Sequence, residues 1–193
     1  MGNIEKSLQN NYLQGQLLVA TPLIKDSCFE KAVIYICSHD ENGAMGILIN
    51  HVLGDLTCTD IFSQLDIENP KTDISPPIHF GGPVESSKGF ILHTADYSCQ
   101  DTKNLQGNIS ITSTIDVLKD IASGKGPGKS IIALGCAGWS PGQLENEIRQ
   151  NSWINVPANE NLIFNMENRR KWSESAKTLG VDLMKYSTSV GNA

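Results

Sequence analysis

The chain has 193 residues, and its 21 acidic and 15 basic side chains give a formal net charge of −6. Hydrophobic residues make up 39% and charged residues 19%, which is typical of a soluble globular protein. No apolar run approaches the roughly 18 residues of a membrane span, and an acidic surface repels a phosphate backbone. Membrane insertion and direct nucleic-acid binding are therefore not expected.

A chain of this length fits one domain, residues 1–193, with a polar N-terminal arm at 1–14 and a small, frayed tail at 187–193. The N-terminus lacks the basic start and apolar core of a secretory signal, and the five cysteines are odd in number and widely spaced. We therefore expect a cytoplasmic protein with reduced thiols and no cofactor.

The first third of the chain predicts strands followed by one helix. Asn42-Gly43 predicts a hairpin turn, because this pair supplies the positive φ angles that a twist-matched turn requires. Apolar spacing after this hairpin predicts a helix over 56–65, with Thr59 as its N-cap. The strands are expected at 15–20, 32–39 and 44–50.

The middle of the chain predicts two strands, 78–85 and 88–94, joined by a turn. Gly81 and Gly82 mark a bulge or a close backbone approach in the first of them. A short strand at 109–112 then leads into a helix capped near Ser113 and stopped by Gly124.

A glycine-rich link with two lysines follows, at 124–129. It invites comparison with a phosphate-binding loop, but such a loop follows a strand and opens a helix, whereas this segment follows a helix and opens a strand. We interpret it as a plain connection.

The stretch 130–145 carries the strongest local pattern. Residues 130–134 predict a buried central strand, followed by a tight turn. Ser140 has the position of an N-cap and Pro141 that of the first helical residue, so the helix is expected to start at Pro141. Beyond it we expect strands at 153–156 and 162–164, and a helix over 168–179, with Trp172, Ala176 and Leu179 inward, that Gly180 ends.

Several glycine-rich motifs together resemble one bacterial family, the AlgH (YqgE-like) family, nearly from end to end. These motifs are Gly15 to Pro22, Gly43-Ala44-Met45-Gly46, Gly81-Gly82-Pro83-Val84 with Gly89-Phe90 and His93, Gly124-Lys125-Gly126-Pro127, and Leu134 to Trp139 with Gly142-Gln143-Leu144-Glu145. Trp153, Trp172 and the small C-terminal Val190-Gly191-Asn192-Ala193 also agree.

The resemblance implies a single α/β domain, with a mixed, bent and bifurcated sheet that forms a partial barrel flanked by helices. The family is uncharacterised, and some of its members carry the label of transcriptional regulator. The family has no established catalytic residues that could be assigned to positions in this sequence. The chain departs from the family pattern at Cys136, where Tyr is expected, and at Asn192, where His is expected.

Each of two enzyme hypotheses competes with a purely structural explanation of the same residue. Gly138-Trp139-Ser140-Pro141-Gly142 matches the G-x-S-x-G elbow of a nucleophilic serine, but every histidine precedes Ser140, and a helix cap already explains this residue. Cys136 lies close to the expected helix N-terminus, which favours a thiolate, although free cysteines are often buried structural residues.

A metal site at His79 and His93, with Glu85 between them, matches no known ligand spacing, so no metal is expected. The glycine turns suggest a binding pocket instead, lined by Gly81, Gly82, Pro83, Gly138 and Trp139. Glycines that only allow the sheet to bend explain the same pattern.

The sequence therefore favours a non-catalytic binding or regulatory protein that acts on a protein or small-molecule partner. The alternative is a hydrolase or thiol enzyme that uses Ser140 or Cys136.

Overall fold

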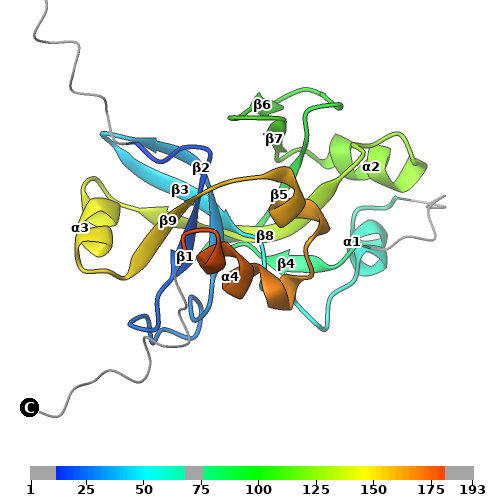
Figure 1. Ribbon diagram of the computed structural model, residues 1–193. Coiled ribbons are helices and arrows are strands. Elements are labelled where there is room, and N and C mark those ends of the chain that lie inside the picture. The colour runs from blue at the N-terminus through cyan, green and yellow to red at the C-terminus, as the bar shows by residue number, and fades with distance from the viewer. Residues whose placement is uncertain (1–11, 68–75, 181–193) are drawn as a thin grey trace, which may run out of the picture.

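A computed structural model describes residues 12–67 and 76–180, so most of the predicted arm and all of the predicted tail lie outside the described residues. Nine strands form one sheet with the order β6-β7-β5-β8-β3-β2-β1-β9, and β4 pairs separately with β8 (Figure 1). The strands are β1 (Gln16–Ala20), β2 (Val33–Asp40), β3 (Gly43–Leu48), β4 (Ile78–Phe80), β5 (Val84–Thr94), β6 (Lys103–Asn104), β7 (Ile109–Thr112), β8 (Ser130–Trp139) and β9 (Trp153–Pro157).

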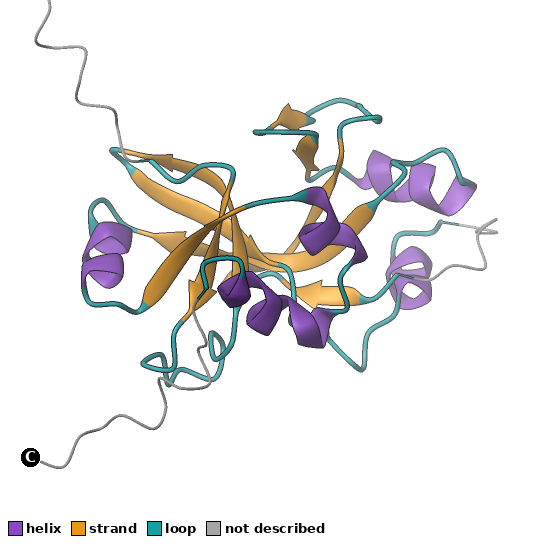
Figure 2. Cartoon of the chain, viewed as in Figure 1, coloured by secondary structure: helices purple, strands orange, loops and turns teal. Residues whose placement is uncertain are grey.

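The helical elements lie around the outside of this sheet, as Figure 2 shows. They are α1 (Cys58–Gln64), α2 (Ile115–Ser123), α3 (Gln143–Arg149), the π-helical turn η1 (Asn161–Asn165) and α4 (Asn168–Lys177). No helix within the described ranges is long and apolar enough to cross a membrane.

Strand β8 is the centre of the sheet, as the sequence predicted. One edge of β8 pairs with β5, while the other edge pairs with β4 at Ile132–Leu134 and with β3 at Ala137–Trp139. Because two different strands share that second edge, the sheet divides along β8. The result is a mixed α/β domain whose largely antiparallel sheet curls into a half-barrel, which confirms the fold that the resemblance implied.

Three clusters of buried apolar side chains hold the helical elements on the sheet. The first cluster joins α4 and η1 to the barrel interior, and the second joins α3 to the opposite face through Leu144 and Trp153. The third cluster lies under α1 and α2, which are neighbours at the β5–β8 end of the sheet (Figure 1). Each cluster removes the apolar face of its helix from water, which is the main source of stability.

Two glycines allow the 81–83 turn to pass directly against β8. Gly82 has a φ of +147°, and a Cβ placed on it would lie 2.2 Å from the carbonyl carbon of Cys136. Gly135 has a φ of +72°, and its Cβ would lie 2.2 Å from the carbonyl oxygen of Gly82. The close backbone approach predicted at this turn is confirmed, and any side chain at either position would force the two backbones apart.

The predicted hairpin of residues 78–85 and 88–94 is wrong. Ala133 of β8 is the partner of His79 on β4 and also of Phe90 on β5, so the two strands lie on opposite edges of β8. The turn signal between them is a bulge inside β5, where the register shifts between Val84 and Gly89. Local turn chemistry could not reveal that a third strand, distant in sequence, lies between the two.

Three predicted helix starts are displaced by one or two residues. The cap of α1 is Thr57, which shares a reciprocal capping box with Asp60, and the N-cap of α2 is Thr114. Helix α3 starts at Gln143 after Gly142, not at Pro141, because β8 continues to Trp139 and leaves only a short turn before the helix. Gly124 ends α2 in the left-handed conformation, as predicted.

The strand predicted at 162–164 is also wrong. These residues form η1, in which the side chain of Asn159 accepts a hydrogen bond from the Leu162 N–H and a wide turn buries Leu162 and Ile163 together. A run of three apolar residues fits both a strand and a helical turn, and it is too short to distinguish the two. In α4, Trp172 and Ala176 are buried as predicted, whereas Leu179 is 43% exposed beyond the end of the helix.

Candidate functional site

A hollow of about 430 Å³ lies where α1 and α2 approach the sheet, and we name it the apolar groove. Its lining contains no charged side chain. It consists of Leu56, Ile61, Gln64, Leu65, Ser87, Gly89, Ile91, Ser113, Thr114, Ile115, Leu118, Ile132 and Leu134. The volume and the apolar lining are those of a site for a small organic group or for one or two side chains of a partner.

The floor of the apolar groove is built from paired residues of β5 and β8. Gly89 is opposite Leu134 and Ile91 is opposite Ile132. A Cβ on Gly89 would meet no atom within 4 Å, so the missing side chain leaves open space at the floor. On the rim, Ile115 at the start of α2 remains 48% exposed, although it is a large apolar residue.

A second hollow of about 290 Å³ lies on the other face of β5, and we name it the charged groove. Two acids and two bases line it beside apolar side chains. Its lining is Cys37, Ser38, Met45, Glu85, Lys88, Phe90, Asp101, Lys103, Leu105, Ile111, Thr112 and Ser113. Lys88 Nζ lies 3.5 Å from Glu85 Oε1 and 5.0 Å from the centre of the Phe90 ring.

The five residues predicted to bind a ligand lie in one neighbourhood but outside both grooves. Gly81 and Gly82 are buried against β8, while Pro83 is exposed. A Cβ on Gly138 would lie 3.5 Å from the Val84 side chain, which follows Pro83 directly. The two turns therefore come together, whereas ligand binding at this point stays a prediction.

Trp139, the fifth of these residues, is a core residue. Its indole N–H donates a 2.8 Å hydrogen bond to Glu147 Oε2, and the indole N–H of Trp153 donates to the same oxygen at 2.8 Å. The two rings meet edge to face with centroids 6.0 Å apart. Glu147 therefore joins two buried tryptophans and fixes α3 to the sheet.

The serine of the G-x-S-x-G motif is exposed in the turn after β8, and it is not the N-cap of α3. Its N–H donates a 3.0 Å hydrogen bond to the side chain of Gln143. Both ring nitrogens of His39 are engaged elsewhere: Nδ1 accepts from the Leu13 N–H at 3.0 Å, and Nε2 donates to Glu145 at 2.9 Å. Within the described residues, no histidine hydrogen-bonds to the Ser140 hydroxyl.

Cys136 does not have the environment predicted for a thiolate. It lies inside β8, it is 3% exposed, and it precedes α3 by seven residues. Burial raises the pKa of the Cys136 thiol, and the nearby Glu85 carboxylate raises this pKa further. The proximity to a helix N-terminus expected from the sequence is wrong because β8 is longer than predicted.

The two histidines considered as metal ligands lie on strands that β8 separates, and the described ranges contain no group of three His, Cys, Asp or Glu residues that could hold a metal ion. His93 Nδ1 donates to a carbonyl oxygen at 2.8 Å, so Nε2 accepts from the Thr112 hydroxyl at 2.9 Å. Thr112 in turn hydrogen-bonds to Thr102, which accepts from the Cys99 N–H. This chain of contacts fixes the loop before β6 to β7. Burial lowers the pKa of His93, which favours the neutral ring.

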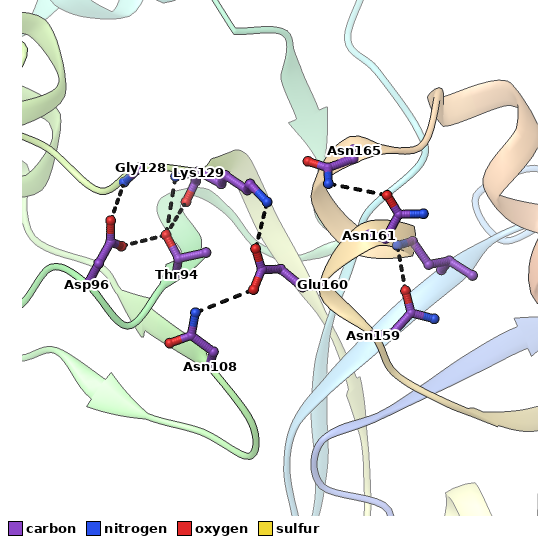
Figure 3. Close-up of polar contacts among 10 residues, drawn as sticks. Thr94, Asp96, Asn108, Gly128, Lys129, Asn159, Glu160, Asn161 and Asn165 are labelled. Carbon is purple, nitrogen blue, oxygen red and sulfur yellow. Dashed lines mark hydrogen bonds and ion pairs between the residues drawn. The ribbon is translucent and has the colours of Figure 1, made fainter.

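The lysine at the end of the glycine-rich link takes part in a network of polar side chains, shown in Figure 3. Lys129 Nζ lies 2.6 Å from Glu160 Oε1, and Asn108 donates to the other oxygen of this carboxylate at 3.4 Å. Asp96 accepts from the Thr94 hydroxyl at 2.5 Å and from the Gly128 N–H at 3.0 Å. These groups satisfy one another and connect η1 to the ends of β5, β7 and β8, which supports the structural interpretation of the link.

The protein is therefore a mixed α/β protein with a curled half-barrel sheet. The sheet divides along one central strand, and a groove lies beneath two helices at one end. The family model described as AlgH-like matches residues 17–184, and the chain belongs to this family. A UPF0301 protein of Afipia carboxidovorans is 42% identical over 190 residues, which cover 94% of this chain and 90% of the relative. A UPF0301 protein of Rhodospirillum rubrum is 43% identical over 182 residues, with coverages of 94% and 95%.

Two solved structures have the same fold. The solution structure of the AlgH protein from Pseudomonas aeruginosa is 37% identical, with a TM-score of 0.75 over 97% of this chain and 100% of that chain. The crystal structure of protein DIP2367 from Corynebacterium diphtheriae is 21% identical, with a TM-score of 0.71 over 90% and 91% of the two chains, and it supports the fold alone.

Proposed function

We propose that this AlgH-like protein is a non-catalytic binding protein of the cytoplasm, which takes an apolar group of its partner into the apolar groove and has a regulatory role. The observation that carries the proposal is the open, uncharged hollow at the junction of α1, α2, β5 and β8. Apolar side chains exposed together in a concave site favour association, because their burial releases ordered water.

The neighbourhood of the motif residues supports binding over catalysis. Ser140 has no histidine as a partner within the described residues, and burial raises the pKa of Cys136. The hydrolase or thiol enzyme remains the second candidate because Ser140 is exposed. Labelling with serine- and cysteine-directed probes, lost in a folded Ser140→Ala or Cys136→Ala variant, would favour that candidate.

The apolar groove can be tested with a matched pair of variants. Gly89 and Gly54 both have open space where a Cβ would lie and a φ outside the left-handed region, but only Gly89 lines the apolar groove. Gly89→Leu therefore fills the groove without a backbone clash, and Gly54→Leu adds the same side chain elsewhere.

The probe is N-phenyl-1-naphthylamine, an uncharged dye that fluoresces in apolar surroundings. We expect saturable binding to the wild type and to Gly54→Leu, and a loss of binding in Gly89→Leu. Equal binding to all three proteins, with circular dichroism showing that each is folded, would reject the apolar groove as the binding site.

A further inference from the structure

The strand that separates the two grooves has a backbone edge that β7 leaves open. The β5–β7 ladder ends at the pair Ile91 and Thr112, after which the chain turns away into α2. Thr94 N–H donates to Lys129 on the β8 side, and Ala95 N–H donates to Asn108 on the β7 side. Because backbone groups alternate along a strand, the N–H and C=O of Gly89 also face the β7 side, one step beyond the end of the ladder.

Alternate residues beside this edge line opposite grooves. Ser87 and Gly89 line the apolar groove, whereas Lys88 and Phe90 line the charged groove. Ser113, the first residue after β7, lines both grooves, so they meet where the ladder ends. A strand added beside Gly89 would therefore direct its own successive side chains into the two grooves in turn.

The charges decide which strand fits. No charged side chain lines the apolar groove, so the residues that face it must be apolar. In the charged groove, Lys88 is paired with Glu85, while Asp101 and Lys103 form no ion pair within the described parts of the chain. The net charge of −6 attracts a basic partner over distance, which selects Asp101 as the group to be paired.

We infer that the occupant is an extended peptide segment of a partner protein, which adds to the edge of β5 at Gly89 with apolar residues in the apolar groove and alternating Lys or Arg residues in the charged groove. This inference rests on the proposed function and names the partner class. The bulge between Val84 and Gly89 limits the open edge to a few residues. Side chains in the two grooves must therefore supply much of the affinity, which makes the edge selective.

The test selects displayed random nine-residue peptides on the full chain and then synthesises the enriched sequences. We expect apolar residues at every second position with Lys or Arg between them. Enriched peptides should bind the wild type and Gly54→Leu but not Gly89→Leu. Asp101→Asn, which suits the left-handed φ of +65° at this position, should weaken binding about threefold, as expected for one exposed ion pair.

Amide hydrogen exchange provides the decisive readout. Bound peptide should slow the exchange of the Gly89 N–H by about tenfold or more, the factor of one net hydrogen bond, and leave the Phe90 N–H, which faces β8, nearly unchanged. Peptides with helical spacing, an unchanged Gly89 amide, or no enriched peptide would each overturn strand addition. If the naphthylamine dye still binds in these cases, the apolar groove remains the binding site and only strand addition is rejected. If the dye does not bind, the proposed function is rejected as well.

Discussion

Replacement of Lys171 by methionine is expected to stabilise the protein at neutral pH and to change the pH dependence of its stability. Lys171 lies on α4 and is 2% exposed, and its Nζ donates one hydrogen bond, 2.7 Å long, to the carbonyl oxygen of Ile49. Burial lowers the pKa of Lys171 from 10.5 to about 8. The protein therefore keeps a cation in its interior at neutral pH without a carboxylate beside it among the described ion pairs.

The magnitude follows from the lowered pKa. Below pH 8 both states hold the proton, and the difference from 10.5 corresponds to about 3 kcal/mol of destabilisation. Between pH 8 and 10.5 the unfolded state binds more protons than the folded state, so stability rises with pH through this window. Lys171→Met removes this effect but leaves the Ile49 carbonyl oxygen without its donor, which costs roughly 1 to 2 kcal/mol.

The assay is urea unfolding followed by tryptophan fluorescence at pH 7, 8 and 9. At pH 7 we expect Lys171→Met to be more stable than the wild type by roughly 1 to 2 kcal/mol, and we expect this advantage to shrink by about 1 kcal/mol at pH 9. Lys171→Arg is the control, because it keeps a charge that cannot be lost in this range. Parallel pH profiles for the wild type and Lys171→Met would show that Lys171 does not lose its proton in the folded protein within this pH range.

Three further changes test the fold around the candidate site. Gly82→Ala should cost more than about 3 kcal/mol in urea unfolding because its Cβ meets backbone, whereas Gly142→Ala, with a left-handed φ but open space, should cost about 1 kcal/mol. Glu147→Ala should cost about 2 to 3 kcal/mol in thermal unfolding because it leaves two indole N–H groups without an acceptor. Glu147→Gln keeps an acceptor oxygen and should keep most of the stability. Equal losses of stability in the two variants would contradict the role of Glu147 as the shared acceptor. The wild type should lose stability as the pH falls below 6.5, because His93 is protonated more readily in the unfolded chain than in the folded protein. His93→Gln should lose less stability over this pH range. The same loss of stability in His93→Gln as in the wild type would show that His93 is not the group responsible.

The elements that local chemistry determines were predictable from the sequence. The Asn42-Gly43 hairpin joins β2 and β3, and Gly124 ends α2 in the left-handed conformation. The strand over 130–134 is central because its apolar residues are covered on both sides. Each of these features has a cause within a few residues of chain.

Features that depend on distant parts of the chain were not predictable. The pairing of β4 and β5 with opposite edges of β8 depends on a strand about forty to fifty-five residues further along. The apolar groove was missed because its lining comes from four elements. Two residues point toward the groove. Gly89 is a glycine inside a strand with open space where a side chain would lie, and Ile115 is an apolar residue at an exposed helix start.

Methyl NMR of the isoleucine-labelled full chain, titrated with N-phenyl-1-naphthylamine, shows whether the apolar groove binds an apolar ligand. Ile61, Ile91 and Ile132 line the apolar groove, whereas Ile34 and Ile36 belong to the core cluster beside α3. We predict saturable shifts of the first three methyl signals, no shift of the other two, and loss of these shifts in Gly89→Leu. Shifts confined to Ile34 and Ile36, or no saturable shift at the groove isoleucines, would exclude the apolar groove as the binding site.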